Sequence, residues 1–167
     1  LTALKSIQQR TKTGIDLNIQ DAPKDQENMR AIEDANATNG IVRMDPLLKI
    51  MDASREDSHL WVHFTNLELV EPEGEKMPYG GTNGQASVIS TKAFNPLEKR
   101  LAKKGAGPEE IKRAKINVIV HELHHALGLS HCKEKGCVMH PNRITKGADL
   151  CPKCDKKIKA NVRRIVK

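Results

Sequence analysis

The sequence is poor in aromatic residues and has no long hydrophobic run. Only Trp61, Phe64, Tyr79 and Phe94 are aromatic among 167 residues, so a core must be built from Ile, Leu, Val and Ala. No run approaches the roughly 18 apolar residues that a membrane-spanning helix needs. Cysteine is absent outside residues 132–154, whereas a disulfide framework normally spreads along a short secreted chain. The hydrophobic content of 38% excludes a disordered chain.

The length of the chain and the pattern of its N-terminal residues indicate how many domains it has and in which compartment it works. A chain of 167 residues fits one domain, which we divide into a part with the sheet and most helices, 1–128, and a C-terminal part, 129–167. Residues 1–20 contain no continuous apolar stretch and no secretory pattern, so we expect a cytoplasmic protein. Because the first residue is Leu1 rather than Met, the sequence leaves open whether residues precede it and whether the protein is exported.

The net charge of +7 conceals two halves of opposite sign. Residues 1–84 carry 9 basic and 14 acidic side chains, and residues 85–167 carry 19 basic and 7 acidic ones. A basic half is typical of proteins that bind nucleic acid or acidic partners. It is equally typical of a solvated, lysine-rich face, so charge alone decides nothing here.

Hydrophobic periodicity predicts an α+β fold in which short strands precede one long helix. The expected strands are 15–19, 41–43, 60–64 and 86–91, the third with apolar contacts on both faces. The expected helices end near residue 7, lie within 21–40, and cover 45–51, 95–105, 108–128 and 155–166. Glycine and proline make 72–84 an irregular segment in this prediction.

The end of the longest expected helix carries the motif HELHHALGLSH, residues 121–131. His121 and His125 are one helical turn apart on the same face, which suits two imidazole nitrogens that bind one metal ion. Gly128 can adopt the left-handed conformation that ends the helix and turns the chain back, so that His131 can supply a third ligand. A histidine cluster in the core or facing solvent is the alternative, but the glycine and third histidine in register argue against it.

Three protein ligands leave the fourth position of a tetrahedral zinc ion free for water, as in catalytic rather than structural sites. Zinc lowers the pKa of a bound water to about 7. Glu122, one position round the helix from His121, can accept the proton of that water as general base and return it to a leaving amine. The pattern therefore predicts hydrolysis through a zinc-bound water.

The four cysteines form two close pairs, Cys132 with Cys137 and Cys151 with Cys154. This spacing is typical of a structural zinc site with four thiolates. A redox-active Cys-x-x-Cys pair and free buried thiols are the alternatives, although the first lacks a βαβ context and leaves the other pair unexplained. Lysines lie close to all four cysteines, which gives the basic half a local explanation: Lys133, Lys135, Lys153, Lys156 and Lys157.

His131 and Cys132 are adjacent in sequence and are predicted to bind different zinc ions. In an extended segment successive side chains point to opposite sides, so one pair of residues can contribute to both sites. We therefore expect the cysteine zinc to hold the loop that aims His131. Two zinc ions per chain follow from this reading, one catalytic and one structural.

The sequence resembles the metzincin zinc peptidases, and specifically the archaemetzincin family, through HELHHALGLSH followed by Cys132, Cys137, Met139, Cys151 and Cys154 in family order. The resemblance covers 112–158 closely. It implies a twisted mixed β-sheet, a long active-site helix and a C-terminal zinc knuckle of four cysteines. It also implies catalytic zinc ligands at His121, His125 and His131, a base at Glu122, a Met-turn at Met139 beneath the zinc, and a peptide or protein as substrate.

Two features depart from the family pattern. Eleven residues separate Met139 from Cys151, which shortens a loop without removing a ligand. Tyr79 is the only tyrosine, so the downstream tyrosine that some metzincins use cannot stabilise an oxyanion here. We expect His124 to be no ligand, His140 to be a surface residue and His63 to be structural, and we expect residues 79–84 to form an ordinary loop or to shape the rim of a cleft.

The sequence therefore predicts a monomeric zinc metallopeptidase that acts on peptide bonds, without a membrane anchor. The rival from another class is a zinc-stabilised module whose basic C-terminal helix binds nucleic acid or an acidic partner. Few aromatics and a histidine motif with an open metal position make nucleic acid the less favoured partner. A third alternative is a scaffold with a peptidase-like fold that binds zinc but turns over little substrate.

Overall fold

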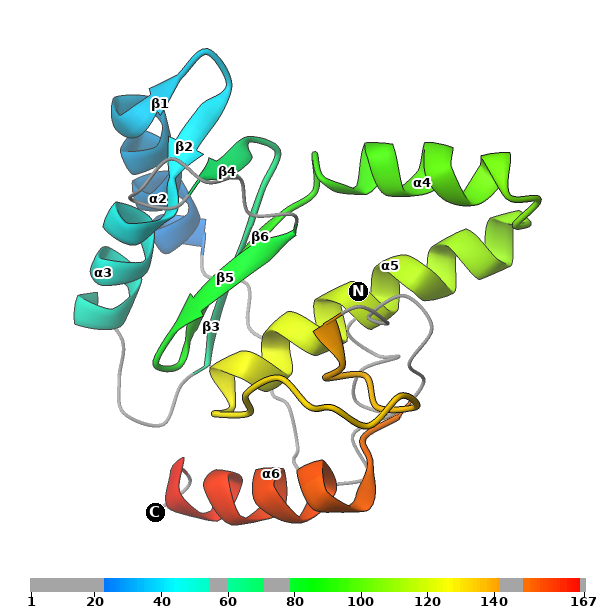
Figure 1. The fold of residues 1–167 in the computed structure, drawn as a ribbon. Helices are drawn as coiled ribbons and strands as arrows, with labels where there is room; N and C mark the ends of the chain where they lie inside the picture. The colour runs from blue at the N-terminus through cyan, green and yellow to red at the C-terminus, as the bar shows by residue number, and fades with distance from the viewer. Residues whose placement is uncertain (1–22, 55–59, 71–78, 142–148, 166–167) are drawn as a thin grey trace.

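The computed structural model describes residues 23–54, 60–70, 79–141 and 149–165, and these form a mixed α+β fold that confirms the predicted fold class (Figure 1). The expected helix end near residue 7 and the expected strand 15–19 lie outside the described residues. None of the described helices has both the length and the apolar character needed to cross a bilayer.

Most predicted elements are confirmed, with small shifts at their ends. The helices are α2 Pro23–Asn36, α3 Met44–Ser54, α4 Phe94–Lys103, α5 Pro108–Ala126 and α6 Pro152–Ile165. The strands are β1 Ala37–Thr38, β2 Ile41–Arg43, β3 Trp61–Thr65, β4 Glu68–Val70, β5 Gly80–Asn83 and β6 Ala86–Ser90. Helix α6 begins three residues before the prediction, because Pro152 occupies its first position, which proline favours.

The prediction of an irregular segment was wrong for residues 80–83, which form β5. The sequence Gly-Gly-Thr-Asn has little intrinsic strand preference, so the strand depends on pairing with β6 rather than on propensity. The expected apolar contacts on both faces of the third strand are confirmed, because Val62 packs against one hydrophobic cluster and Trp61 against the other. Phe64 is the exception, since its side chain is 40% exposed. Strands β1 and β4 are short and carry no pattern from which they could be predicted.

The strands form two three-stranded sheets, ordered β1-β2-β4 and β3-β6-β5. In the second sheet β6 pairs in parallel with β3 and antiparallel with β5. Every residue of β6 is buried, as expected of a central strand with helices on both faces. Among the described residues β5 is one of the two edge strands of this sheet, and it lies beside the C-terminal half of α5 (Figure 1).

Two hydrophobic clusters lie on opposite faces of the β3-β6-β5 sheet. One is centred on α3 and contains Val88 and Leu47. The other contains Ile89 of β6 and buried residues of α4, α5 and α6, including Val118 and Ile158. The second cluster also includes Met139 and two of the cysteines, so the expected metal region is continuous with the core beneath α5.

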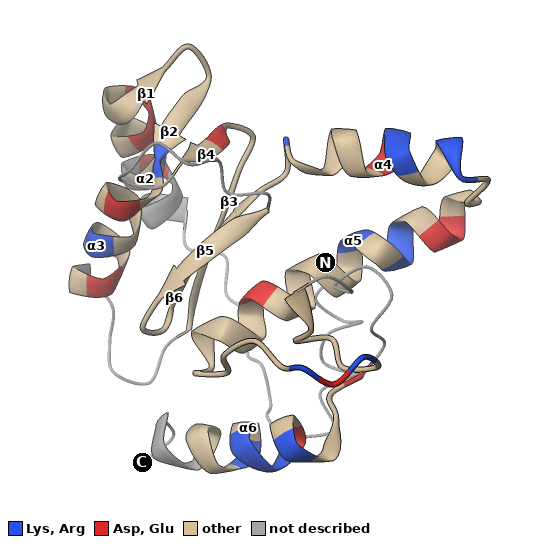
Figure 2. Ribbon diagram, viewed as in Figure 1, with Lys and Arg blue, Asp and Glu red and all other residues tan. Residues whose placement is uncertain are grey.

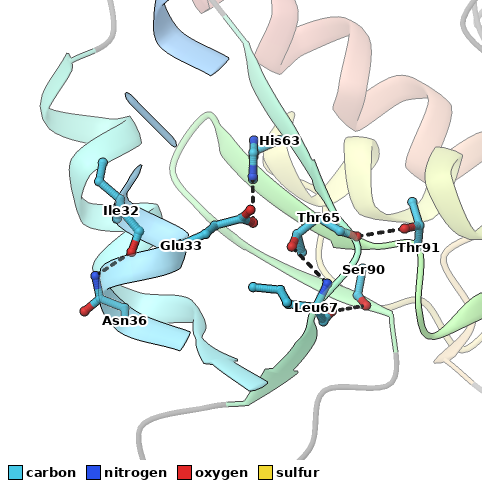
Figure 3. Close-up of polar contacts among 8 residues, drawn as sticks. All are labelled: Ile32, Glu33, Asn36, His63, Thr65, Leu67, Ser90 and Thr91. Carbon is cyan, nitrogen blue, oxygen red and sulfur yellow. Dashed lines mark hydrogen bonds and ion pairs between the residues drawn. The ribbon is translucent and has the colours of Figure 1, made fainter. Parts of the chain in front are cut away.

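Buried polar contacts fix α2 and the β3–β4 turn to the sheets (Figure 3). His63 Nε2 lies 2.9 Å from Glu33 Oε1, which connects β3 to α2 and agrees with the structural role expected of this histidine. Ser90 Oγ donates to the Leu67 carbonyl at 2.6 Å. Thr91 donates to the Thr65 carbonyl through both its backbone N–H and its hydroxyl. These bonds hold β6 in the place from which it supports β5.

Candidate metal centres

Helix α5 carries the first two histidines, and the turn after it carries the third. Gly128 has a φ of +81°, and its N–H donates to the His125 carbonyl at 2.8 Å. A Cβ at position 128 would lie 2.8 Å from Nδ2 of Asn161, which itself donates to the Leu127 carbonyl. The predicted glycine turn is therefore present, and α6 packs closely against it.

His121, His125 and His131 converge as the motif predicts. One ring nitrogen from each lies within 4.8 Å of the others. His121 is buried, His125 is half-buried and His131 is exposed, so the cluster opens toward solvent on one side. The Nε2 atoms of His121 and His125 are 3.0 Å apart. Two nitrogens bound to one tetrahedral zinc ion at about 2.1 Å would lie about 3.4 Å apart, so the spacing fits such an ion.

The hydrogen bonds of these rings favour a cation between the Nε2 atoms. His121 Nδ1 faces the Val138 carbonyl at 2.8 Å, and His125 Nδ1 faces the Leu129 carbonyl at 2.7 Å. A carbonyl can only accept, so both Nδ1 atoms carry the proton. Burial lowers the pKa of His121 to about 4 and also lowers the pKa of His125, which keeps both rings neutral. The two Nε2 atoms thus face each other with bare lone pairs, an arrangement that a metal ion stabilises.

Glu122 directly follows His121 on α5 and is 7% exposed. Burial raises its pKa to about 7, since its carboxylate is desolvated. Its Cγ lies against β5: a Cβ at Gly80 would be 3.4 Å from that atom and 2.4 Å from the Val88 carbonyl oxygen. Gly80 is therefore a position where only glycine fits between β6 and Glu122.

The four cysteines form a second cluster, with all four sulfurs within 4.8 Å of one another. Cys132 Sγ and Cys151 Sγ are 3.7 Å apart, and none of the four is in a disulfide. Tetrahedral zinc with sulfurs at about 2.3 Å separates them by about 3.8 Å. The two pairs come together in one set, which disfavours an isolated redox pair at Cys151 and Cys154.

A tight turn, Cys137–His140, links the two clusters. The His140 N–H donates to the Cys137 carbonyl at 3.0 Å and closes the turn. Met139 is completely buried within it. The Met139 carbonyl accepts from the Cys132 N–H at 2.9 Å, and the Val138 N–H donates to the Asp149 carbonyl at 2.9 Å.

The remaining histidines are not in either cluster. His124 is buried on α5, neither ring nitrogen has a hydrogen-bond partner among the described residues, and burial lowers its pKa to about 4. His140 is half-buried rather than on the surface. Tyr79 receives a hydrogen bond from Arg100 and packs near Phe94. Thus Tyr79 belongs to the α4 side of the core.

The carbonyl groups that orient the histidine ligands could not be predicted from the sequence. The Val138 and Leu129 carbonyls are backbone atoms, so no residue type could signal them. Gly80 lay in a segment that was predicted to be irregular, and its contact with Glu122 depends on a strand pairing that the sequence did not reveal. A signal was present only in the doubled glycine, which permits a close approach between backbone and side chain.

Comparisons with known proteins point to one family. The family model described as peptidase family M54 matches residues 110–160. The archaemetzincin of Thermococcus kodakarensis is 36% identical over 52 residues, and this match spans 28% of this chain and 28% of that relative. Residues 110–160, which the family model matches, include every histidine and cysteine of the two clusters.

Two solved structures share the fold. The archaemetzincin of Methanopyrus kandleri aligns with a TM-score of 0.60 and 20% identity, over 78% of this chain and 72% of that one. A zinc-dependent peptidase from Methanocorpusculum labreanum aligns with a TM-score of 0.51 and 19% identity, over 81% and 70% of the two chains. At such identities the likeness shows the fold alone. Residues 110–160 are thus similar to peptidase family M54, and the fold of the chain is similar to that of an archaemetzincin.

Proposed function

We propose that this protein is a zinc-dependent metallopeptidase that hydrolyses peptide bonds. The observation that carries the proposal is the pair of bare Nε2 atoms of His121 and His125, 3.0 Å apart, with His131 and a buried carboxylate beside them. A scaffold that binds zinc only for stability needs no buried carboxylate next to its histidine ligands. The match of residues 110–160 to a peptidase family supports the same activity, and the chain spans 28% of the length of the curated archaemetzincin that it matches.

The three histidines would hold the zinc ion, which supplies Lewis acidity toward water and toward the scissile carbonyl when it is bound. Glu122 accepts the proton of the attacking water and then donates it to the departing amine. Its pKa of about 7 in the protein without metal is close to the value at which one group performs both transfers. Its buried position keeps bulk water from competing for that proton.

Strand β5 is the element on which the substrate would lie. It is an edge strand of its sheet, and edge strands present unpaired backbone groups that can pair with an extended peptide. Gly80 is in contact range of Glu122, so a peptide aligned along β5 would pass close to the general base. Main-chain pairing of this kind recognises peptides as a class rather than one side chain.

The four cysteines would hold a second zinc ion with a structural role. Four thiolates fill a tetrahedral coordination sphere and leave no position for substrate. This gives two zinc ions per chain, one at each cluster. We also propose that the chain acts as a monomer with both zinc ions bound.

The decisive experiment is peptide hydrolysis by zinc-loaded protein with Glu122→Gln. Loss of a general base lowers the rate by about 10²–10⁴-fold, and we expect kcat to fall in that range while zinc content is unchanged. Glu110→Gln is the matched control, because Glu110 is exposed in the first turn of the same helix. Full activity of the Glu122 variant, or no cleavage by a wild-type protein that retains its zinc, would contradict the proposal.

A second candidate function rests on the charge distribution. Basic side chains occur on α6 as well as on α4 and α5 (Figure 2), and Lys153 and Lys156 of α6 are exposed. Others are engaged: Lys159 pairs with Asp155, and Lys157 donates to Ser130. If this helix binds nucleic acid, affinity for an oligonucleotide must fall steeply with added salt. We expect no binding of the oligonucleotide at physiological salt. That result would leave the peptidase as the single proposed function.

A further inference from the structure

Two of the metal-ligand histidines are oriented by carbonyls from different parts of the chain. The partner of His125 Nδ1 is the Leu129 carbonyl, four residues later in the turn that ends α5. The partner of His121 Nδ1 is the Val138 carbonyl, 17 residues later. His125 is therefore oriented by its own helix end, whereas His121 depends on a distant turn.

That distant turn is built from the cysteine cluster. Val138 directly follows Cys137, whose sulfur accepts from the Cys151 N–H at 3.4 Å. On the other side of Val138, the Met139 carbonyl accepts from the Cys132 N–H at 2.9 Å. The carbonyl that faces His121 thus lies between two residues that are both tied to cysteines of the cluster.

The third ligand depends on the same cluster through the covalent chain. His131 is exposed. Backbone carbonyls orient the rings of His121 and His125, but within the described residues no such hydrogen bond orients the ring of His131. It immediately precedes Cys132, whose sulfur lies 3.7 Å from Cys151 Sγ. Fixing the Cys132 side chain in a metal site therefore fixes the backbone from which His131 projects.

We propose that the four-cysteine centre is the positioning element of the histidine centre, through Val138 for His121 and through Cys132 for His131, with His125 outside its control. This rests on the proposed binding of a metal ion at both centres. Groups that orient metal ligands are worth about 10–100-fold in metal affinity. Filling the cysteine centre should raise the zinc affinity of the histidine centre by a factor in that range.

The test uses Cys154→Ser, because Cys154 lies on α6 and outside residues 131–139, so the substitution leaves the connecting segment chemically intact. We expect the zinc affinity of the histidine centre, measured by competition with a chromophoric chelator, to fall about 10–100-fold. In ¹⁵N spectra of the imidazole rings, His121 should lose the signature of its Nδ1 hydrogen bond and His125 should keep it. A general loss of structure would change both rings alike. Cys154→His, which restores a zinc ligand, should restore the affinity and the His121 signal.

A measurement on the wild-type protein covers the case in which Cys154→Ser fails to fold. Cadmium favours thiolates, so one equivalent added to metal-free protein is expected at the cysteines, where sulfur-to-cadmium absorbance reports it. Zinc affinity at the histidines is then compared with and without cadmium. An increase of about 10-fold or more supports the coupling, and equal affinities overturn it. Absence of zinc binding at the histidines in either state would instead overturn the proposed function.

Discussion

The two proposed metal centres of this protein are built from one short stretch of chain, yet their donor atoms differ. The histidine centre has three nitrogen donors, of which His131 is exposed, and the buried Glu122 follows its first donor in the sequence. The cysteine centre has four sulfur donors at mutual distances that suit a complete tetrahedron. The number of donors, rather than the metal, separates a centre that can do chemistry from one that can only hold the chain.

Different elements of the fold also contribute to the two centres. Helix α5 and strand β5 surround Glu122 and the first two histidines, whereas the turn Cys137–His140 and helix α6 surround the cysteines. His131 and Cys132 are the one point where adjacent residues belong to different centres. Changes on each side of this point should therefore have distinguishable effects.

The largest effect is expected for Cys132→Ser. It removes a donor from the cysteine centre and releases the backbone that carries His131, so we expect loss of both zinc ions and of all peptidase activity. Metal analysis by mass spectrometry measures this directly. Retention of one zinc per chain with full activity would show that the two centres are independent.

Glu122→Gln should stabilise the metal-free protein at pH 8. Burial raises the pKa of Glu122 from its ordinary value of 4.5 to about 7, so the folded state keeps a proton that the unfolded state has lost. Stability attributable to this group is therefore lost as the pH rises from 4.5 through 7, by about 3 kcal/mol at most.

Urea denaturation of wild type and variant, both without metal, checks this prediction. The variant should be the more stable at pH 8, and the difference should vanish at pH 4, where the carboxyl is protonated in both states. An equal difference at both pH values would mean that the buried charge is not its cause. No such gain is expected from Glu110→Gln, because that side chain is exposed.

Gly80→Ala is expected to have a smaller effect that is confined to the histidine centre. The new Cβ would lie 2.4 Å from the Val88 carbonyl oxygen and 3.4 Å from Glu122 Cγ, so β5 must move. We expect a loss of about 1–3 kcal/mol in the free energy of unfolding and a reduced kcat, with zinc at the cysteines unaffected. Gly107→Ala is the control, because a Cβ there meets nothing within 4 Å.

The parts of the site that could be predicted from the sequence are those that residue types signal. The helical spacing of His121 and His125, the glycine turn at Gly128 and the two cysteine pairs all depend on local geometry, and the structure brings each set together. The long helix was likewise predicted within two residues at its C-terminus, because proline and glycine delimit it.

The parts that could not be predicted depend on distant backbone. Strand β5 has a sequence without strand preference and exists because β6 pairs with it. The Val138 carbonyl has no side-chain signature, yet it fixes which nitrogen of His121 faces the metal position. Phe64 alternates like a buried residue but lies on an edge strand, β3, where one side of the sheet ends.

We propose that His121, His125 and His131 form a metal centre distinct from that of the cysteines. Native mass spectrometry of zinc-loaded wild type and of His125→Ala tests it most directly, because His125 is the ligand whose orientation does not depend on the cysteine cluster. We predict two zinc ions for the wild type and one for the variant, which should retain its cysteine-bound zinc. One zinc in the wild type, or two in the variant, would contradict it.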